Sequence, residues 1–446
     1  MNVAAMKFDT QPGDAAAQLG ENYHSVASGL PGGAGVGAMR DKAIAALAEA
    51  GLPGRRVEEW KYTDLRTHLK SAFPPADKDD APISEQDLKA ALGALAGLGH
   101  DDAHLMVFIN GTYRLDRLNY GDGPKVSTLS HALDERAEWA QSLLGKVNPQ
   151  EMADPVLQLN TAFMTDGAAV HIPAGVKLEK PLHLVFLTRG ANSHSVATRN
   201  IISVEEGAEA TIIEQHVTLG DTAFQTNSVT EMKVADGAKV EHIKLQDESL
   251  GSMHLATWAV DLGKASSYRG VHLATGAALS RHQLFLRFND NDARGHYYGA
   301  QLMRGKQHCD MTLVIDHDSV GCESREHVKA VLDDSARGVF QAKVIVRPDA
   351  QQTDGHQMAQ ALLLSDNAEF DAKPELEIYA DDVKCNHGAT SGAIDEDLMF
   401  YLKARGIPED EARAMLIQAF IGEILDQIEN EKLSEAFAAK AKKWLG

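Results

Sequence analysis

The stretch that decides the fold is Arg281-His282-Gln283-Leu284-Phe285-Leu286-Arg287-Phe288. Its even positions carry histidine or large apolar side chains, and its odd positions carry mainly charged or polar ones. Side chains that alternate with a period of two point to opposite faces of a β-strand. The ranges 341–347 and 375–379 repeat this alternation. We therefore predict a series of short strands, each with one face directed into a core.

Turn signals separate these alternating segments after Pro155 and recur with a long period. Gly207, Gly237 and Gly263 lie in similar turns, 30 and then 26 residues apart, and a later pair of turns repeats after a comparable distance. A repeat of this length fits one coil of a β-solenoid, in which each coil buries its inner face against the next. An antiparallel sandwich stays an alternative. We favour the solenoid, because a sandwich does not need the long period.

The parts of the chain that flank the strands have mainly helical patterns. The first clear apolar stripe of a helix runs from Met39 to Ala50, and the Gly-, Ala- and Pro-rich residues before it hold at most a short helix. We predict four segments: a flexible N-terminal segment (1–38), a mainly helical N-terminal domain (39–155), a β-helix core (156–390) and a C-terminal helical domain (391–446).

The C-terminal segment carries the signals of a helix-turn-helix appendage. Asp395 can cap a first helix, and Gly406 can end it in the left-handed conformation. Pro408 fits the first turn of a second helix, and a last helix is expected over Lys432–Trp444. The expected apolar face of the second helix consists of Ala412, Leu416, Ala419, Phe420 and Ile424.

Composition restricts the partners and the location of the protein. The 446 residues include 43 Lys and Arg against 64 Asp and Glu, a net charge of −21, which disfavours binding to nucleic acid. No long apolar run and no basic, apolar leader is present, so we expect neither a membrane span nor a secretory signal. Three cysteines are too few for a disulfide framework. We expect the reducing cytoplasm.

One short stretch, Val383-Lys384-Cys385-Asn386-His387-Gly388, carries metal-binding chemistry. If it lies in a strand, Cys385 and His387 project from one face, and a thiolate with an imidazole suits zinc or iron. Two ligands are too few for a closed site, so a second chain would have to complete it. The alternative is that both side chains only pack against neighbours.

The sequence has no phosphate-binding loop, dinucleotide fingerprint or hydrolase motif. Any dependence on ATP would therefore come from a partner, and no catalytic residue is assigned. A carbohydrate-active enzyme with a β-helix, such as a polysaccharide lyase or hydrolase, remains a rival interpretation, with Asp310, Asp316 and Asp318 as candidate acids. A purely structural homodimer is a third.

Several runs resemble the SufB/SufD family of iron–sulfur cluster assembly proteins. The C-terminal runs are Pro374–Ile378, Asp381–Thr390, Phe400–Leu402 and Ala404–Ile407, and the upstream runs are Leu159–Phe163, Ile172–Val176 and Pro181–Leu182. Glu59-Trp60-Lys61-Tyr62-Thr63-Asp64-Leu65 is similar to the N-terminal signature of the SufD branch. The resemblance covers the chain from about residue 55 to about residue 430.

The resemblance implies a right-handed parallel β-helix between helical N- and C-terminal parts. It also implies a scaffold without enzyme activity of its own, paired with SufB across a β-helix interface and with the ATPase SufC on the C-terminal helices, where Tyr401, Arg405 and Phe420 are the expected contacts. A transient iron ion or cluster would be held at the SufB interface by His387, with Cys385 as a secondary ligand. SufB usually has an acidic residue where this chain has Gly388, so no cofactor is expected to bind stably to this chain alone.

Overall fold

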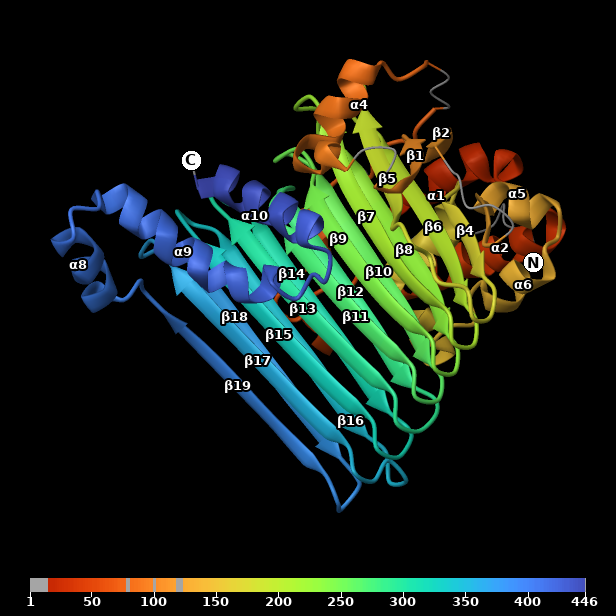
Figure 1. The fold of residues 1–446 in the computed structure, drawn as a ribbon. Coiled ribbons are helices and arrows are strands. Elements are labelled where there is room, and N and C mark those ends of the chain that lie inside the picture. The colour runs from red at the N-terminus through yellow and green to blue at the C-terminus, as the bar shows by residue number, and fades with distance from the viewer. Residues whose placement is uncertain (1–14, 78–80, 99–101, 118–122, 446) are drawn as a thin grey trace.

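The computed structural model describes residues 15–77, 81–98, 102–117 and 123–445. Its body is a β-solenoid of about eight coils over residues 169–392 (Figure 1). The strands fall into two sheets, one built from the odd-numbered strands β5 to β19 and the other from the even-numbered strands β4 to β18. The alternation and the long turn period thus lead to the solenoid, and the sandwich alternative was wrong.

The strands of the first sheet are β5 (Leu182–Arg189), β7 (Glu209–Leu219), β9 (Lys239–Asp247), β11 (Ser267–Ala274), β13 (Arg294–Met303), β15 (Glu323–Leu332), β17 (Asp354–Leu363) and β19 (Lys384–Gly392). Those of the second are β4 (Ala168–Ile172), β6 (Ser195–Val204), β8 (Gln225–Val234), β10 (Met253–Leu262), β12 (Leu279–Phe288), β14 (His308–His317), β16 (Arg337–Val346) and β18 (Glu369–Ile378).

Each coil repeats the register of the coil before it. The strand that contains the quoted stretch, β12, pairs in parallel with β10 and β14, so that His282 lies opposite Ala256 on one side and Met311 on the other. Gly207 and Gly237 turn the chain with φ angles of 64° and 65°, which a side chain would disfavour. The inward-facing apolar residues of both sheets form one continuous core. This stacking of inner faces stabilises the solenoid.

Ionisable side chains also lie in this interior. Glu214, Lys244 and His272 occupy adjacent positions on β7, β9 and β11 and are fully buried. His242 lies between Glu214 and Trp258: its Nε2 is 2.9 Å from a Glu214 carboxylate oxygen, and its ring stacks on the indole at 3.8 Å. The core is therefore apolar towards one side of the coils and polar along the other.

The region before the solenoid consists of helices, most of them short, and three strands. They are α1 (Ala15–Val26), η2 (Ala27–Gly29), α2 (Gly33–Ala50), η3 (Glu58–Trp60), α3 (Leu65–His68), α4 (Glu85–Leu92), η4 (Gly93–Gly97), β1 (His104–Ile109), β2 (Thr112–Arg117), β3 (Lys125–Thr128), α5 (Leu129–Asp134), α6 (Glu138–Leu143), η5 (Pro149–Ala153) and α7 (Pro155–Phe163). Strands β1 and β2 extend the first sheet, and β3 extends the second.

Two predicted boundaries differ from the structure at this end. The predicted flexible segment, 1–38, contains α1 and the start of α2. Leu19 and Tyr23 of α1 are buried and anchor this helix to its neighbours. Residues 1–14 lie outside the described residues. The first residues of the predicted β core belong to α7. Asp154 caps this helix by accepting hydrogen bonds from two backbone amides, and Pro155 occupies its first position.

The chain ends in three helices, α8 (Glu396–Ala404), α9 (Glu409–Leu425) and α10 (Glu431–Leu445). Asp395 caps α8 through the amides of Asp397 and Leu398, and Gly406 ends it with a φ of 85°, as the sequence predicted. The buried face of α9 matches the predicted one in part. Ala412 and Ile424 are buried as predicted, and the other buried residues are Ile417, Ile421 and Leu425.

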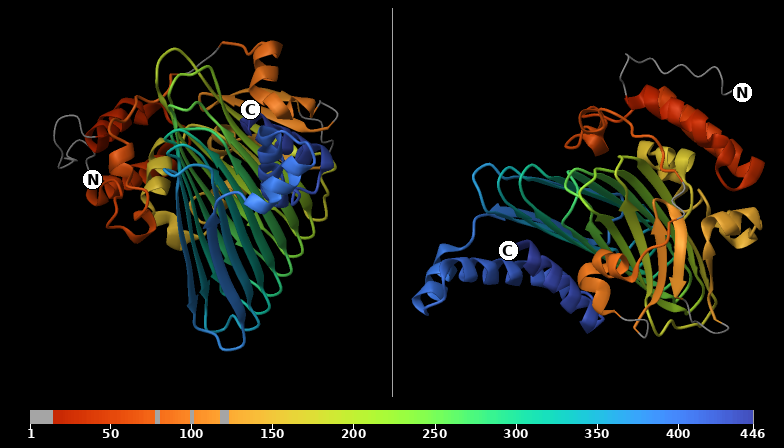
Figure 2. Two further views of the ribbon diagram at one scale, coloured as in Figure 1. Left: turned by 90° about the vertical axis from the view of Figure 1, so that its left-hand side faces the viewer. Right: turned by 90° about the horizontal axis from the view of Figure 1, so that it is seen from above.

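The flanking helices pack on the outer faces of both sheets (Figure 2). From the N-terminal region, α4 packs against β7 of the first sheet, and η4 contacts α10. Helix α7 packs against β6, β8 and β10 of the second sheet, and α9 packs against β13 and β15 of the first. No helix within the described ranges is both long and apolar enough to cross a membrane. At the last coil, Glu58 of η3 pairs with Lys373 of β18, and β19 is largely exposed.

Candidate functional site

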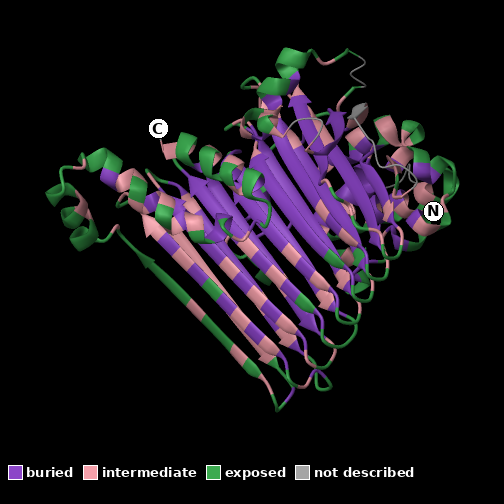
Figure 3. Cartoon of the chain, in the orientation of Figure 1, coloured by how far each residue is buried: buried purple, intermediate pink, exposed green. Residues whose placement is uncertain are grey.

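The solenoid has an open end at its last coil. Strands β18 and β19 are the terminal strands of their sheets, and within the described chain each pairs with a neighbour on one side only. Figure 3 shows β19 largely exposed along its length, in contrast to the buried strands of the inner coils. The outer edges of both strands therefore present unpaired backbone donors and acceptors.

Cys385 and His387 both lie on β19. In the pairing with β17, Cys385 lies opposite Gly355 and His387 opposite Gln357. Because they are two residues apart on a strand, both belong to the inward face. Cys385 is half-buried against the core, and His387 is exposed. The structure thus brings the two predicted ligands to one face of the open end, and we call this pair the half-site.

The environment of Cys385 favours the thiol over the thiolate. Its sulfur packs over Gly355 of β17, 3.5 Å from the position that a Cβ there would take, which is an ordinary van der Waals distance. Burial is the largest cause that raises the pKa of Cys385 above its ordinary value of 9.0, and Asp354 and Glu326 add to it. A protonated thiol is a poor metal ligand. To bind a metal, Cys385 would have to lose its proton, which a bound cation favours.

No complete metal site is present within the described chain. Nowhere in it do three or more His, Cys, Asp or Glu side chains gather in a way that could hold a metal ion. Cys309 and Cys322 are unpaired and buried elsewhere in the solenoid, and burial raises the pKa of Cys322 to about 11. Cys385 and His387 alone offer two potential ligands, fewer than a closed metal site needs.

A buried acid that the sequence did not reveal lies behind the half-site. Glu326 on β15 is opposite Gln357, which is in turn opposite His387, so the three form one inward column. Burial raises the pKa of Glu326 to about 8, which keeps the carboxyl largely protonated near neutral pH. Alternation on β15 places Glu326 inward, but its alignment with His387 depends on the register of three strands that are distant in sequence.

The residues predicted to bind the ATPase lie in two different environments. Tyr401 lies on α8, which buries none of its residues, and Arg405 is the C-cap of this helix. The Arg405 guanidinium lies 4.1 Å from the centre of the Tyr401 ring. Phe420 on α9 faces the solenoid instead, with the ammonium of Lys329 4.4 Å from its ring centre. The structure therefore brings Tyr401 and Arg405 together and separates Phe420 from them.

Comparison with known proteins identifies the family of this fold. Residues 186–420 match the family model described as "SUF system FeS cluster assembly, SufBD core domain", and residues 32–184 match the "SufBD protein N-terminal region". The chain belongs to the SufBD family.

Individual SufBD proteins are similar over most of their length. An iron–sulfur cluster assembly SufBD family protein of Synechocystis is 35% identical over 404 residues, which cover 87% of this chain and 86% of the relative. The iron–sulfur cluster assembly protein SufD of Escherichia coli is 31% identical over 88% of this chain and 89% of its own. A chloroplastic protein of Arabidopsis thaliana is 29% identical over 89% of this chain and 83% of its own. This SufBD protein is SufD-like.

The N-terminal signature of this SufBD protein clamps the N-terminal region to the solenoid. Trp60 is fully buried, and the guanidinium of Arg281 on β12 lies 3.8 Å from its ring centre. The same guanidinium donates to the Glu59 carbonyl and pairs with Asp310 on β14. Thr63 also donates to Asp310. The signature thus has a structural role, because it satisfies a buried Arg–Asp pair.

The three acids considered for a carbohydrate-active enzyme are engaged in ion pairs in this SufBD protein. Their partners are Arg281 for Asp310, Arg347 for Asp316 and Arg287 for Asp318. A glycosidase needs one carboxyl group that can hold a proton and a second that is free to act as a base or nucleophile. Carboxylates paired with arginine do not provide this combination, so the site does not support the rival function.

Proposed function

We propose that this chain is a scaffold subunit, without enzyme activity of its own, that pairs with SufB and with the ATPase SufC during iron–sulfur cluster assembly. The open end with its half-site carries the proposal. Its two ligands face inward at an unpaired edge, so a second β-helix that docks there would supply the missing ligands. His387, with Cys385 as the secondary ligand, would then contact iron and sulfide as they assemble.

The edges of β18 and β19 suit a partner that continues both sheets. Backbone groups at a sheet edge can pair with a strand of another chain, and apolar side chains add specificity. Ile378 and Tyr379 at the end of β18 are 40% and 61% exposed, unusual values for such large apolar groups, and Met358 on β17 is 40% exposed. In isolation the same edges could pair with a second copy of this chain, which would give a homodimer.

Helix α8 and the adjoining part of α9 suit the ATPase. Leu398, Phe400 and Tyr401 on α8 and Met415 on α9 are all exposed, with Phe400 at 73%. Exposed apolar groups gathered on one short helix are typical of a protein contact. Because this chain has no phosphate-binding loop, ATP hydrolysis belongs to the partner.

The unpaired state of all three cysteines supports our expectation of a reducing compartment, the cytoplasm.

Two tyrosine substitutions test these surfaces against each other. Tyr379→Asp places a charge at the β18 edge, and Tyr401→Asp places the same charge on α8. We expect Tyr379→Asp to lose SufB and keep SufC in co-purification, and Tyr401→Asp to do the reverse, with both variants unfolding at the wild-type temperature. Retention of both partners by either folded variant would contradict the surface assigned to it.

A further inference from the structure

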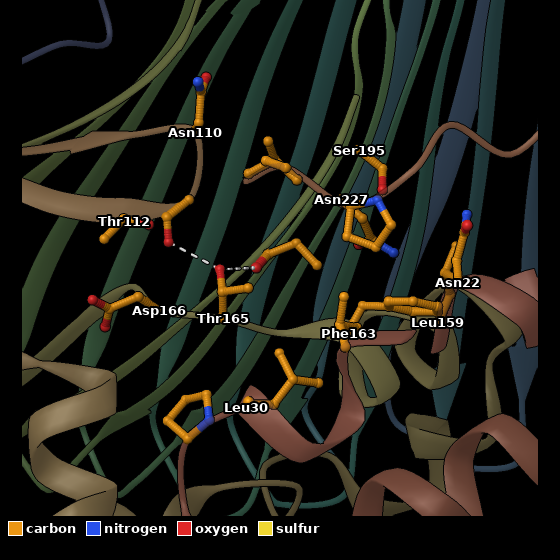
Figure 4. Close-up of a pocket in the computed structure, with 18 of the residues that line it drawn as sticks. Asn22, Leu30, Asn110, Thr112, Leu159, Phe163, Thr165, Asp166, Ser195 and Asn227 are labelled. Atoms are coloured by element: carbon orange, nitrogen blue, oxygen red, sulfur yellow. Dashed lines mark hydrogen bonds between the residues drawn. The ribbon is translucent and has the colours of Figure 1, made fainter. Parts of the chain in front are cut away.

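A large cavity lies at the opposite end of the molecule from the half-site. It has a volume of about 740 Å³ and lies between α1, the loop at residues 28–33, α7, the β1–β2 turn and the first residues of β6 and β8 (Figure 4). Neither Cys385 nor His387, nor any residue of α8, lines it. The function proposed above therefore makes no use of this cavity.

The cavity has an apolar floor and a polar rim. Leu30, Leu159 and Phe163 form part of the floor. The rim carries uncharged hydrogen-bonding groups, with Asn110 and Thr112 on one side in Figure 4 and Asn22, Ser195 and Asn227 on the other. Small-molecule sites combine a mainly apolar lining with a few polar groups in a similar way, at volumes of about 300–1,000 Å³.

The walls of the cavity are held in place by buried interactions. The guanidinium of Arg40 is buried and donates hydrogen bonds to the carbonyls of Ala162, Met164 and Pro31, which fixes the loop that carries Leu30 against the end of α7. Gly111 adopts a φ of 76°, and a Cβ there would lie 2.8 Å from Thr165 Oγ1. The cavity is thus preformed, which lowers the entropic cost of binding.

The charges of the lining exclude one class of ligand. Among the lining residues within the described chain there is no Lys, Arg or His, and the only ionisable ones are Asp134 and Asp166. Asp166 accepts hydrogen bonds from the amides of Ser130 and Gly167, and burial raises the pKa of its carboxyl. An anionic group placed here would lose its hydration without gaining a cation. Phosphate- or sulfonate-bearing molecules therefore do not fit.

We propose that this cavity binds an uncharged, mainly apolar organic molecule with an aromatic ring system and a hydrogen-bond donor. The rings would pack against Leu30, Leu159 and Phe163, and the donor would meet the oxygens of the rim. This role is independent of the half-site.

Two dyes that differ by one charged group test the proposal. N-phenyl-1-naphthylamine is uncharged and has an N–H donor, and 1-anilinonaphthalene-8-sulfonate is the same arylamine with a sulfonate. We expect the uncharged dye to bind the full chain with one-to-one stoichiometry in a fluorescence titration, at least tenfold more tightly than the sulfonate. Asp166→Asn should reduce the difference in affinity between the two dyes, because it removes a negative charge. The asparagine oxygen can still accept the hydrogen bonds from the Ser130 and Gly167 amides.

Cavity-filling variants locate the binding. Leu30→Trp should weaken binding of the uncharged dye at least tenfold, and Ser195→Trp, which fills the cavity from the other side, should do the same if Leu30→Trp fails to fold. Leu398→Trp on exposed α8 is the matched control and should bind as the wild type does.

Three results would overturn the proposal. The first is equal affinity for the two dyes, and the second is unchanged binding of the uncharged dye in both folded cavity-filling variants. The third is binding that appears only in a chain lacking residues 2–14, since the chain itself would then occupy the cavity.

Discussion

His387 and Cys385 share a face because a strand alternates its side chains, and this could be predicted from two positions in the sequence. The column of Glu326, Gln357 and His387 could not be predicted in this way. Glu326 is 61 residues before His387 in the chain, and only the register from β15 through β17 to β19 places the two in line. The sequence therefore predicted that Cys385 and His387 share a face. It did not predict the largely protonated Glu326 carboxyl that lies beyond Gln357 in the same column.

The Glu326 carboxyl leads to a prediction about pH. The folded-state pKa is raised to about 8 from an ordinary value of 4.5, so between these pH values the unfolded chain has lost a proton that the folded chain keeps. The contribution of Glu326 to stability therefore decreases as pH rises through this window, by up to about 1.4 kcal/mol per pH unit. Glu326→Gln should remove that decrease.

Denaturant unfolding of both proteins at several pH values between 5 and 8 measures this effect. The free energy of unfolding of Glu326→Gln, relative to that of the wild type, should increase towards pH 8. Glu206→Gln, at an exposed turn of the solenoid, is the control and should follow the wild type. A constant difference between Glu326→Gln and the wild type would show that this carboxyl ionises normally in the fold.

At the scale of elements, the caps and turns of the C-terminal helices were predictable, and the buried face of α9 was predictable only in part. Apolar side chains lie on more than one face of α9, so the sequence pattern fits two stripes related by a rotation of about 100°. The contact with β13 and β15 selects the stripe of Ile417 and Ile421. Phe420 then lies at the border of that face, over Lys329, where it is only half-buried.

Two phenylalanines on these helices allow a matched prediction. Phe420→Ala should lower the free energy of unfolding by about 1–3 kcal/mol, because it removes half-buried apolar area and a cation–π contact. Phe400→Ala, on exposed α8, should leave stability within about 0.5 kcal/mol and weaken SufC binding. Denaturant unfolding and co-purification with SufC measure the two effects. A stable Phe420→Ala variant that loses SufC would restore Phe420 to the docking surface.

The N-terminal clamp is a second element whose motif was visible but whose role was not. Trp60→Ala should destabilise the chain by about 3–5 kcal/mol, because it opens a cavity and leaves Arg281 without its aromatic neighbour. Trp60→Phe keeps a ring under the guanidinium and should cost much less. Thermal unfolding compares the variants. Equal losses of stability in both variants would mean that the contact needs the whole indole and that a phenyl ring stacked on Arg281 cannot replace it.

At the scale of the whole molecule, the long turn period predicted a solenoid, because stacked coils need such a repeat. The helical N-terminal region was less predictable. Most of its helices are short, and some of its contacts join residues far apart in the sequence, as in the contact of Trp60 with Arg281. Helices pack on the outer faces of both sheets, and within the described chain the outer edges of β18 and β19 remain unpaired. The proposed function depends on these edges.

The most direct test of the account is the iron and sulfide content of the complex with SufB and SufC, assembled anaerobically with His387→Ala. The control is Asn386→Ala, an exposed neighbour on the opposite face of β19. We predict a folded, intact complex with at least tenfold less iron and sulfide for His387→Ala, a smaller loss for Cys385→Ala and wild-type content for Asn386→Ala. Normal cluster content in an intact His387→Ala complex would contradict the account.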